Sequence, residues 1–157
     1  MEPHAESNSA RAVSGCTLKF DRLRRLLLVT FGKVATRESS LAAYTAVARF
    51  LAVEGPCSII ADLSAIERIE ITADAVRSFA WTPPATSAPK PCIIVAPRVV
   101  VYGLSRMFQL YRDSMSIDIQ VVHTLQEAFK LLRVRYPHFE AVDPAGGRAV
   151  AQGASIL

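Results

Sequence analysis

Apolar positions divide the chain into short strands and longer helical segments. Leu18 and Phe20, and then Leu26, Leu28 and Thr30, set a period of two within 17–32, which predicts two strands joined in a hairpin by a turn at Asp21 and Arg22. Residues 57–63 are apolar on both faces, which is typical of an interior parallel strand. Two further apolar runs predict strands at 92–96 and 117–122.

Helical spacing predicts one helix after the hairpin and another after the interior strand at 57–63. Thr36 is placed to cap the first helix, which Gly55 and Pro56 end. Its predicted buried stripe contains Leu41, Tyr44, Val47, Ala48 and Leu51. Thr72 stands at the N-cap position of a second helix, which begins ahead of Asp74.

A third helix follows the strand at 92–96, beginning near Val99. Helical spacing puts Leu104, Phe108, Tyr111 and Met115 on the same buried face as Val99. The opposite, polar face contains Arg98, Tyr102, Arg106 and Gln109. Such a crossover helix matters because binding sites in open α/β sheets gather at the carboxyl ends of strands.

A fourth helix begins with the clearest local signal in the chain. Thr124 and Glu127 fit the capping box, in which each side chain satisfies the backbone N–H of the other. The order of elements is then β-β-α-β-α-β-α-β-α. Because parallel strands need crossover helices, this order predicts an α/β fold: a mixed, mostly parallel sheet with an antiparallel first strand pair. We expect one domain over 17–136, with a disordered tail at 1–16 and a flexible tail at 137–157.

Composition narrows the function classes. The 157 residues are 51% hydrophobic and carry a net charge of +4, and the basic residues are dispersed without interleaved aromatics. We therefore expect no nucleic-acid partner. No apolar run approaches the length of a membrane span or a secretory leader, which predicts a cytoplasmic protein that is not an integral membrane protein.

Catalytic and metal-binding patterns are missing from the sequence. The three cysteines have no paired spacing and the three histidines are scattered, so neither a disulfide framework nor a metal site is expected. Asp62, Ser64, Glu67, Glu70 and Asp74 cluster in sequence, but no histidine accompanies them. No nucleophile elbow or phosphate-cradling loop occurs either. We expect a protein that is not an enzyme and uses no cofactor.

Several residues together resemble a known family. The order of elements, the Asp62-Leu63-Ser64 ending of the interior strand, and Ala96-Pro97 followed by YGLSRMFQLY at 102–111 are similar to the STAS domain. The likeness is greatest to its SpoIIAA-like, CRAL-TRIO-related bacterial branch, and it covers about 17–135. The resemblance implies a STAS-like single domain that acts as a regulatory module through protein binding in a signalling or anti-sigma-type pathway.

The resemblance also indicates a partner surface at the start of the second helix. In anti-anti-sigma members of the family, a serine in an Asp-Ser-Ser-Gly motif there is phosphorylated. The matching stretch here is Glu70-Ile71-Thr72-Ala73, so Thr72 keeps a hydroxyl although the glycine and the preceding serine are missing. Thr72 is either a helix cap alone or also a phosphorylation site, and Arg68 and Asp74 would share its surface.

The alternative function is binding of an apolar small molecule or lipid, as the CRAL-TRIO-related branch implies. Tyr102, Arg106 and Met107 would line a cleft beside the start of the second helix, with Trp81 at its edge. The same polar face is equally consistent with a solvated helix surface. Gly103, which is costly inside a helix, indicates a close backbone approach or a tight helix-on-sheet contact.

Overall fold

The structure is a computed structural model that describes residues 15–80, 90–113 and 118–143. Twelve elements follow one another along these residues. They are β1 (Cys16–Asp21), β2 (Leu26–Phe31), β3 (Val34–Thr36), α1 (Arg37–Glu54), β4 (Ser58–Asp62), β5 (Arg68–Glu70), α2 (Ala73–Ala80), β6 (Cys92–Val95), α3 (Val99–Asp113), β7 (Ile119–Val122), α4 (Leu125–Leu131) and β8 (Glu140–Val142).

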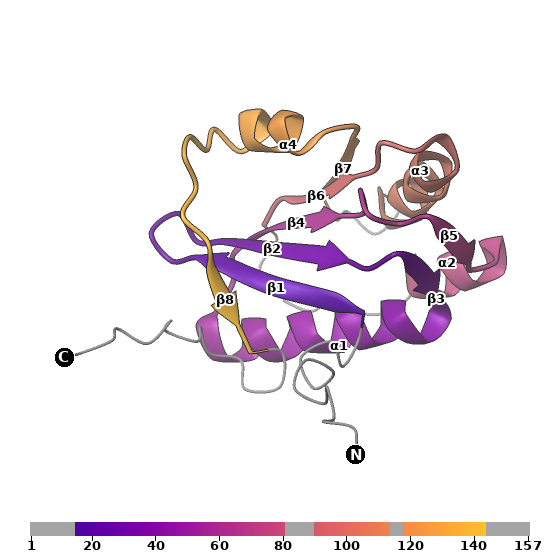
Figure 1. Cartoon of the computed structure of the whole chain (residues 1–157), viewed down its shortest axis with the longest axis horizontal. Helices are drawn as coiled ribbons and strands as arrows, with labels where there is room; N and C mark the ends of the chain where they lie inside the picture. The colour runs from indigo at the N-terminus through magenta and orange to yellow at the C-terminus, as the bar shows by residue number, and fades with distance from the viewer. Residues whose placement is uncertain (1–14, 81–89, 114–117, 144–157) are drawn as a thin grey trace, which may run out of the picture.

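A six-stranded sheet in the order β7-β6-β4-β2-β1-β8 forms the centre of the fold (Figure 1). The strand β1 is antiparallel to β2 and to β8, whereas β2, β4, β6 and β7 are parallel to one another. The predicted class, a mixed and mostly parallel α/β sheet with an antiparallel first pair, is confirmed. The hairpin turn lies at 22–25, later than predicted, because Asp21 still pairs with Leu26 in the ladder.

Three short strands change the predicted order. The strands β3 and β5 form a separate parallel pair, and β8 adds to the free edge of β1. Because β8 lies at 140–142, the predicted flexible tail from 137 is corrected for these residues. Cys16 likewise begins β1 and is buried, although the predicted tail included it. The remaining tail residues, 1–14 and 144–157, lie outside the described residues.

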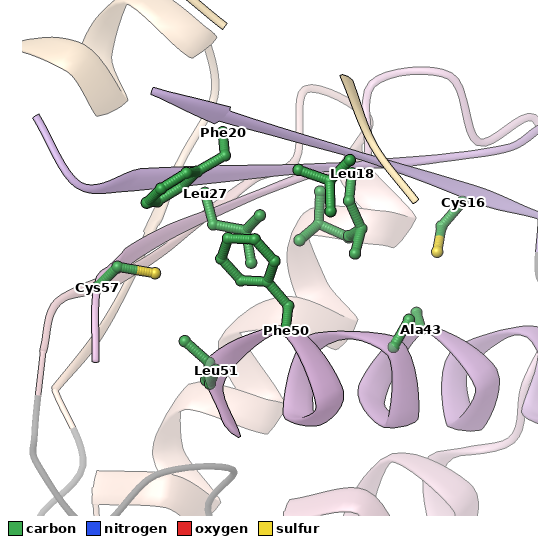
Figure 2. Close-up of a cluster of buried hydrophobic side chains, with 11 residues drawn as sticks. Cys16, Leu18, Phe20, Leu27, Ala43, Phe50, Leu51 and Cys57 are labelled. Atoms are coloured by element: carbon green, nitrogen blue, oxygen red, sulfur yellow. The ribbon is translucent and has the colours of Figure 1, made fainter. Parts of the chain in front are cut away.

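The helix α1 covers one face of the sheet through a core centred on Phe50 (Figures 1 and 2). The ring of Phe50 meets that of Phe20 edge to face, with centroids 4.9 Å apart. Ala43, Ala46 and Leu51 are buried beside it, whereas Leu41 of the predicted stripe is exposed. The predicted stripe is confirmed at Leu51 and Val47, which belong to this core, and is wrong at Leu41. Apolar residues surround this helix, so spacing alone does not determine its inward face.

The opposite face of the sheet is covered by α4. Side chains alternate along each strand, so Leu27 and Val29 of β2 point to the α1 core while Leu26 and Leu28 point to α4. The predicted inward face of α4 is confirmed, since Ala128 is fully buried and its neighbours Leu125, Phe129 and Leu132 pack against the same cluster. The predicted capping box also forms: Thr124 accepts from Glu127 N, and Glu127 from the cap backbone.

The helix α3 packs on the third cluster, beside the carboxyl ends of β4 and β6. Its buried positions are Val101, Ser105 and Arg112, with Phe108 partly buried. Val99, predicted to be inward, is 87% exposed. Three successive valines begin this helix, so the pattern did not distinguish which of them faces the sheet. Met115 lies outside the described residues.

Candidate functional site

The short parallel sheet of β3 and β5 brings the starts of two helices together. Val34 pairs with Arg68 and Thr36 pairs with Glu70, so α1 and α2 begin from neighbouring strands. Lys33 O accepts from the backbone N–H groups of Glu67 and Arg68, at 2.7 and 3.1 Å, which fixes the register before the first pair. Ala35 is buried in the third cluster. One face of this small sheet is therefore anchored, while Arg68 and Glu70 are exposed.

Each of the two helices is capped by a threonine. The Thr36 hydroxyl accepts from Ser39 N at 3.0 Å, and Ser39 Oγ accepts from Thr36 N at 2.9 Å. Thr72 Oγ1 accepts from Ala75 N at 3.1 Å, and Thr72 O accepts from Val76 N at 3.1 Å. The predicted capping role of Thr72 is thereby confirmed, and its side chain remains exposed.

An open depression of about 310 Å³ lies between these helix starts. The residues that line it come from the start of α1, the end of β5 and the first two turns of α2. They are Arg37, Glu70, Ile71, Thr72, Asp74, Ala75 and Ser78. Both signs of charge are therefore present, with one guanidinium and two carboxylates on a lining that mixes polar and apolar atoms.

Arg68 does not point freely toward Thr72. Its Nε lies 3.1 Å from Glu70 Oε1, and both side chains are more than half exposed. An exposed pair of this kind contributes about 0 to 1 kcal/mol, so it is easily exchanged for another partner. Arg37, which sequence reasoning missed, is the cation that lines the depression with Thr72. No local signal marks it, because the contact depends on the pairing of β3 with β5.

Tyr102 lies against His123, which follows β7. The two rings are stacked with centroids 4.3 Å apart and an interplanar angle of 7°. The predicted cleft beside the start of the second helix stays a prediction: Tyr102 stacks on His123 after β7, and it packs against the same cluster as Ile71, which precedes Thr72. The stack was not predictable from spacing, since His123 belongs to the loop that precedes α4.

Arg106 and Met107, two further residues of the predicted ligand cleft, do not line the depression. Arg106 is exposed and donates to Gln109 Oε1, and Gln109 Nε2 in turn donates to Ile119 O at 2.7 Å. Met107 is half-buried, and Trp81 lies outside the described residues. Gly103 is exposed, and a Cβ there would meet nothing within 4 Å. Among the residues that the structure describes, the close approach expected at Gly103 is therefore not found.

Two of the clustered hydroxyl and carboxylate groups of the sequence, Asp62 and Ser64, close a turn. Asp62 Oδ1 accepts from Ser64 N at 3.0 Å and from Ser64 Oγ, which closes the loop that follows β4. Within residues 15–80, 90–113 and 118–143, no group of three or more His, Cys, Asp and Glu side chains is arranged to hold a metal ion.

Burial controls the titration of three groups outside the depression. Burial raises the pKa of the Cys57 and Cys92 thiols to about 11 in each case. Burial also holds the pKa of Arg112 below its ordinary value. The Arg112 guanidinium lies 5.4 Å from the centroid of the Phe108 ring and is 95% shielded from solvent by its surroundings, a setting that suits a cation on an aromatic face.

Comparison of the chain with protein-family models, with curated proteins and with solved structures finds no significant match. The STAS resemblance therefore stays a prediction that rests on the residues named for it. Among the helices of the described residues, none has the length and apolar character that crossing a membrane requires.

Proposed function

We propose that this protein is a non-enzymatic, STAS-like regulatory module of the cytoplasm that binds a protein partner through the starts of α1 and α2. The observation that carries the proposal is the open depression between the two helix starts. Sites for small molecules are concave, enclosed and mostly apolar. This one is open and has a mixed polar lining, which suits the side chains of another protein.

The charges around the depression support recognition of a protein. Arg68, Glu70 and Asp74 are exposed, and Arg37 lines the depression from the neighbouring helix. Exposed charges of both signs set partner choice and association rate by complementarity, more than they add affinity. The partner is expected to present an acidic group to Arg37 or Arg68 and a basic group to Asp74.

Thr72 is proposed as the control point of this surface. Its exposed hydroxyl stands at the start of α2, where the helix dipole stabilises a negative charge. A phosphate there would add about two negative charges beside Glu70 and Asp74. A partner chosen by the unmodified charge pattern would then bind more weakly.

Site-specific photo-crosslinking tests the proposal. A benzophenone amino acid is introduced at Ser78, which lines the depression, and separately at Arg49, an exposed position on α1 away from it. In cells of the source organism, one discrete protein adduct is expected from position 78 and none from position 49. The captured protein is then purified and its affinity measured.

Variants of Thr72 complete the test with the purified partner. Thr72→Glu should weaken binding by about tenfold or more, the equivalent of about 1.4 kcal/mol. Thr72→Ser, which keeps the hydroxyl cap, should bind as the unchanged protein does. Equal affinity of all three proteins would remove Thr72 from the function.

The apolar-ligand alternative predicts a different outcome. Native mass spectrometry of the protein from its own cells would then show a retained apolar molecule that is lost in Arg106→Ala. That result, together with identical adduct patterns at positions 78 and 49, would contradict the partner-binding proposal.

A further inference from the structure

Two turns lie side by side at the end of the sheet where β2 begins, and the depression lies at the other end. One is the hairpin turn at 22–25, and the other is the connection at 132–139 between α4 and β8 (Figure 1). His138 N donates to Asp21 Oδ2 at 2.9 Å, which joins the two turns directly. Val134 and Phe139 pack against the cluster that contains Leu26, so the residues between them loop outward. We name residues 22–25 and 132–139 the arginine edge.

The arginine edge concentrates positive charge. Its two segments contain five arginines and no aspartate or glutamate. Arg24 pairs with the buried Asp21 at 3.0 Å, and Arg25 donates to backbone carbonyls at the end of α1. The three others, Arg22, Arg133 and Arg135, are exposed. Glu140, which follows the second segment, is the acidic residue that borders it in sequence.

Two large apolar side chains project from the same edge. Leu23 is 86% exposed and lies between Arg22 and Arg24, and Tyr136 is 91% exposed and follows Arg135. Neither side chain contributes to the core clusters. Their exposure therefore has no explanation in the stability of the fold.

The backbone of this edge is held in an uncommon conformation. Arg25, Arg133 and Tyr136 have φ angles of 50°, 56° and 50°, and these are the non-glycine residues with positive φ among those that the structure describes. A bulky residue in this region is strained, and such strain gathers at functional surfaces. Hydrogen bonds from Arg133 N to Lys130 O and from Val134 N to Phe129 O hold the turn in place. Tyr136, held in this conformation, has its side chain in solvent.

We infer that the arginine edge docks on the surface of an anionic phospholipid bilayer. Guanidinium groups match phosphate oxygens in geometry and charge, and basic residues near an anionic membrane each add to its attraction. Leucine and tyrosine tips fit the boundary between headgroups and acyl chains, where apolar bodies are buried and a phenol stays hydrated. A single-stranded nucleic acid would stack its bases on aromatic faces; Tyr136 offers one such face, but the apolar Leu23 tip offers none and fits a bilayer better. The arginine edge and the proposed partner site lie at opposite ends of the sheet, and the two proposals are independent of each other.

Vesicle sedimentation of the full chain tests this inference. Vesicles of phosphatidylcholine mixed with phosphatidylglycerol should bind the protein, whereas vesicles of phosphatidylcholine alone should not. The double variant Arg133→Gln/Arg135→Gln should bind about 25-fold more weakly, at about fivefold for each basic residue. Arg49→Gln, which removes an exposed charge on α1, should bind as the unchanged protein does.

A second variant separates docking from folding. Tyr136→Gly relieves the positive φ and removes a ring with little packing, so its melting temperature should not fall. Its vesicle binding should nevertheless fall about tenfold, as expected for an apolar side chain withdrawn from the bilayer. Leu110→Ser, at an exposed position on α3, is the matched control and should bind normally.

The inference is overturned if both vesicle types sediment the protein equally, or if the double arginine variant binds unchanged. Binding of random-sequence duplex DNA without any vesicle binding, lost in the same double variant, would also overturn it and assign the edge to nucleic acid.

Discussion

The carboxylate of Asp21 accepts a hydrogen bond from the backbone N–H of His138, 2.9 Å away and 117 positions later in the chain. The same carboxylate accepts from Arg24 N at 2.9 Å and pairs with the Arg24 guanidinium at 3.0 Å. One buried side chain thus closes the hairpin turn and holds the segment that leads into β8. This contact explains how a three-residue edge strand is positioned on β1.

Replacing Asp21 by asparagine should destabilise the fold. The side-chain N–H₂ group of the asparagine would face Arg24 and the His138 N–H, which are hydrogen-bond donors to the Asp21 carboxylate. We therefore expect a loss of about 2 kcal/mol in the free energy of unfolding. Urea denaturation at neutral pH measures it. Asp113→Asn, exposed at the end of α3, is the control and should change stability by less than about 0.5 kcal/mol.

The contribution of Asp21 should also depend on pH. Burial raises the pKa of this carboxyl, but the hydrogen bonds from Arg24 and His138 and the Arg24 charge outweigh burial and hold the pKa below its ordinary value. As the pH falls, the Asp21 carboxyl is protonated in the unfolded chain before it is protonated in the folded protein. Its contribution to the free energy of unfolding is therefore present above about pH 4 and is lost as the pH falls through the pKa of the folded protein. The stability difference between the native protein and Asp21→Asn should therefore shrink below about pH 4. A constant difference down to strongly acidic pH would contradict this assignment.

Truncation of Phe50 tests the α1 core. The side chain is fully buried against Phe20 and Leu27, so Phe50→Ala should cost about 3 to 5 kcal/mol in the free energy of unfolding, measured with urea. Val53→Ala, at an exposed position one turn later, should cost less than about 0.5 kcal/mol. Similar losses from both variants would show that α1 does not face the sheet as described.

Replacing Gly103 by alanine should stabilise the protein. Glycine inside an exposed helix costs about 1 kcal/mol relative to alanine, and an added Cβ would meet nothing within 4 Å. We expect a rise of about that size in the free energy of unfolding. A fall instead would indicate a neighbour that touches this position in the folded chain.

The thiols of Cys57 and Cys92 should be unreactive in the native state. With their pKa raised to about 11 by burial, the thiolate is scarce at pH 8, and alkylation needs the thiolate. Mass spectrometry after brief iodoacetamide treatment should find neither residue modified until denaturant is added. Rapid native labelling of either residue would place it nearer to solvent than the structure does.

The sequence predicted those parts of the fold that depend on local signals. The Thr124 capping box, the Thr72 cap and the interior strand at 57–63 each rest on residues close together in the chain, and the structure contains all three. The strand β8 escaped prediction because three residues with a single buried position, Val142, show no alternation. Its place depends on the distant carboxylate of Asp21.

The candidate site was predictable only in part. Thr72, Arg68 and Asp74 were located because they surround a recognisable helix start. Arg37 was missed because only the pairing of β3 with β5 brings the two helix starts together. Tyr102 was identified as a distinctive residue, but its partner His123 comes from another loop. Contacts across elements of this kind leave no periodic trace in a sequence.

Hydrogen–deuterium exchange of the complex with the protein captured at position 78 tests the central claim most directly. The account predicts that binding slows exchange at 68–78 and at the first turn of α1, and leaves exchange at 22–25 and 132–139 unchanged. Slower exchange confined to the arginine edge or to α3, with 68–78 exchanging as in the isolated chain, would contradict it.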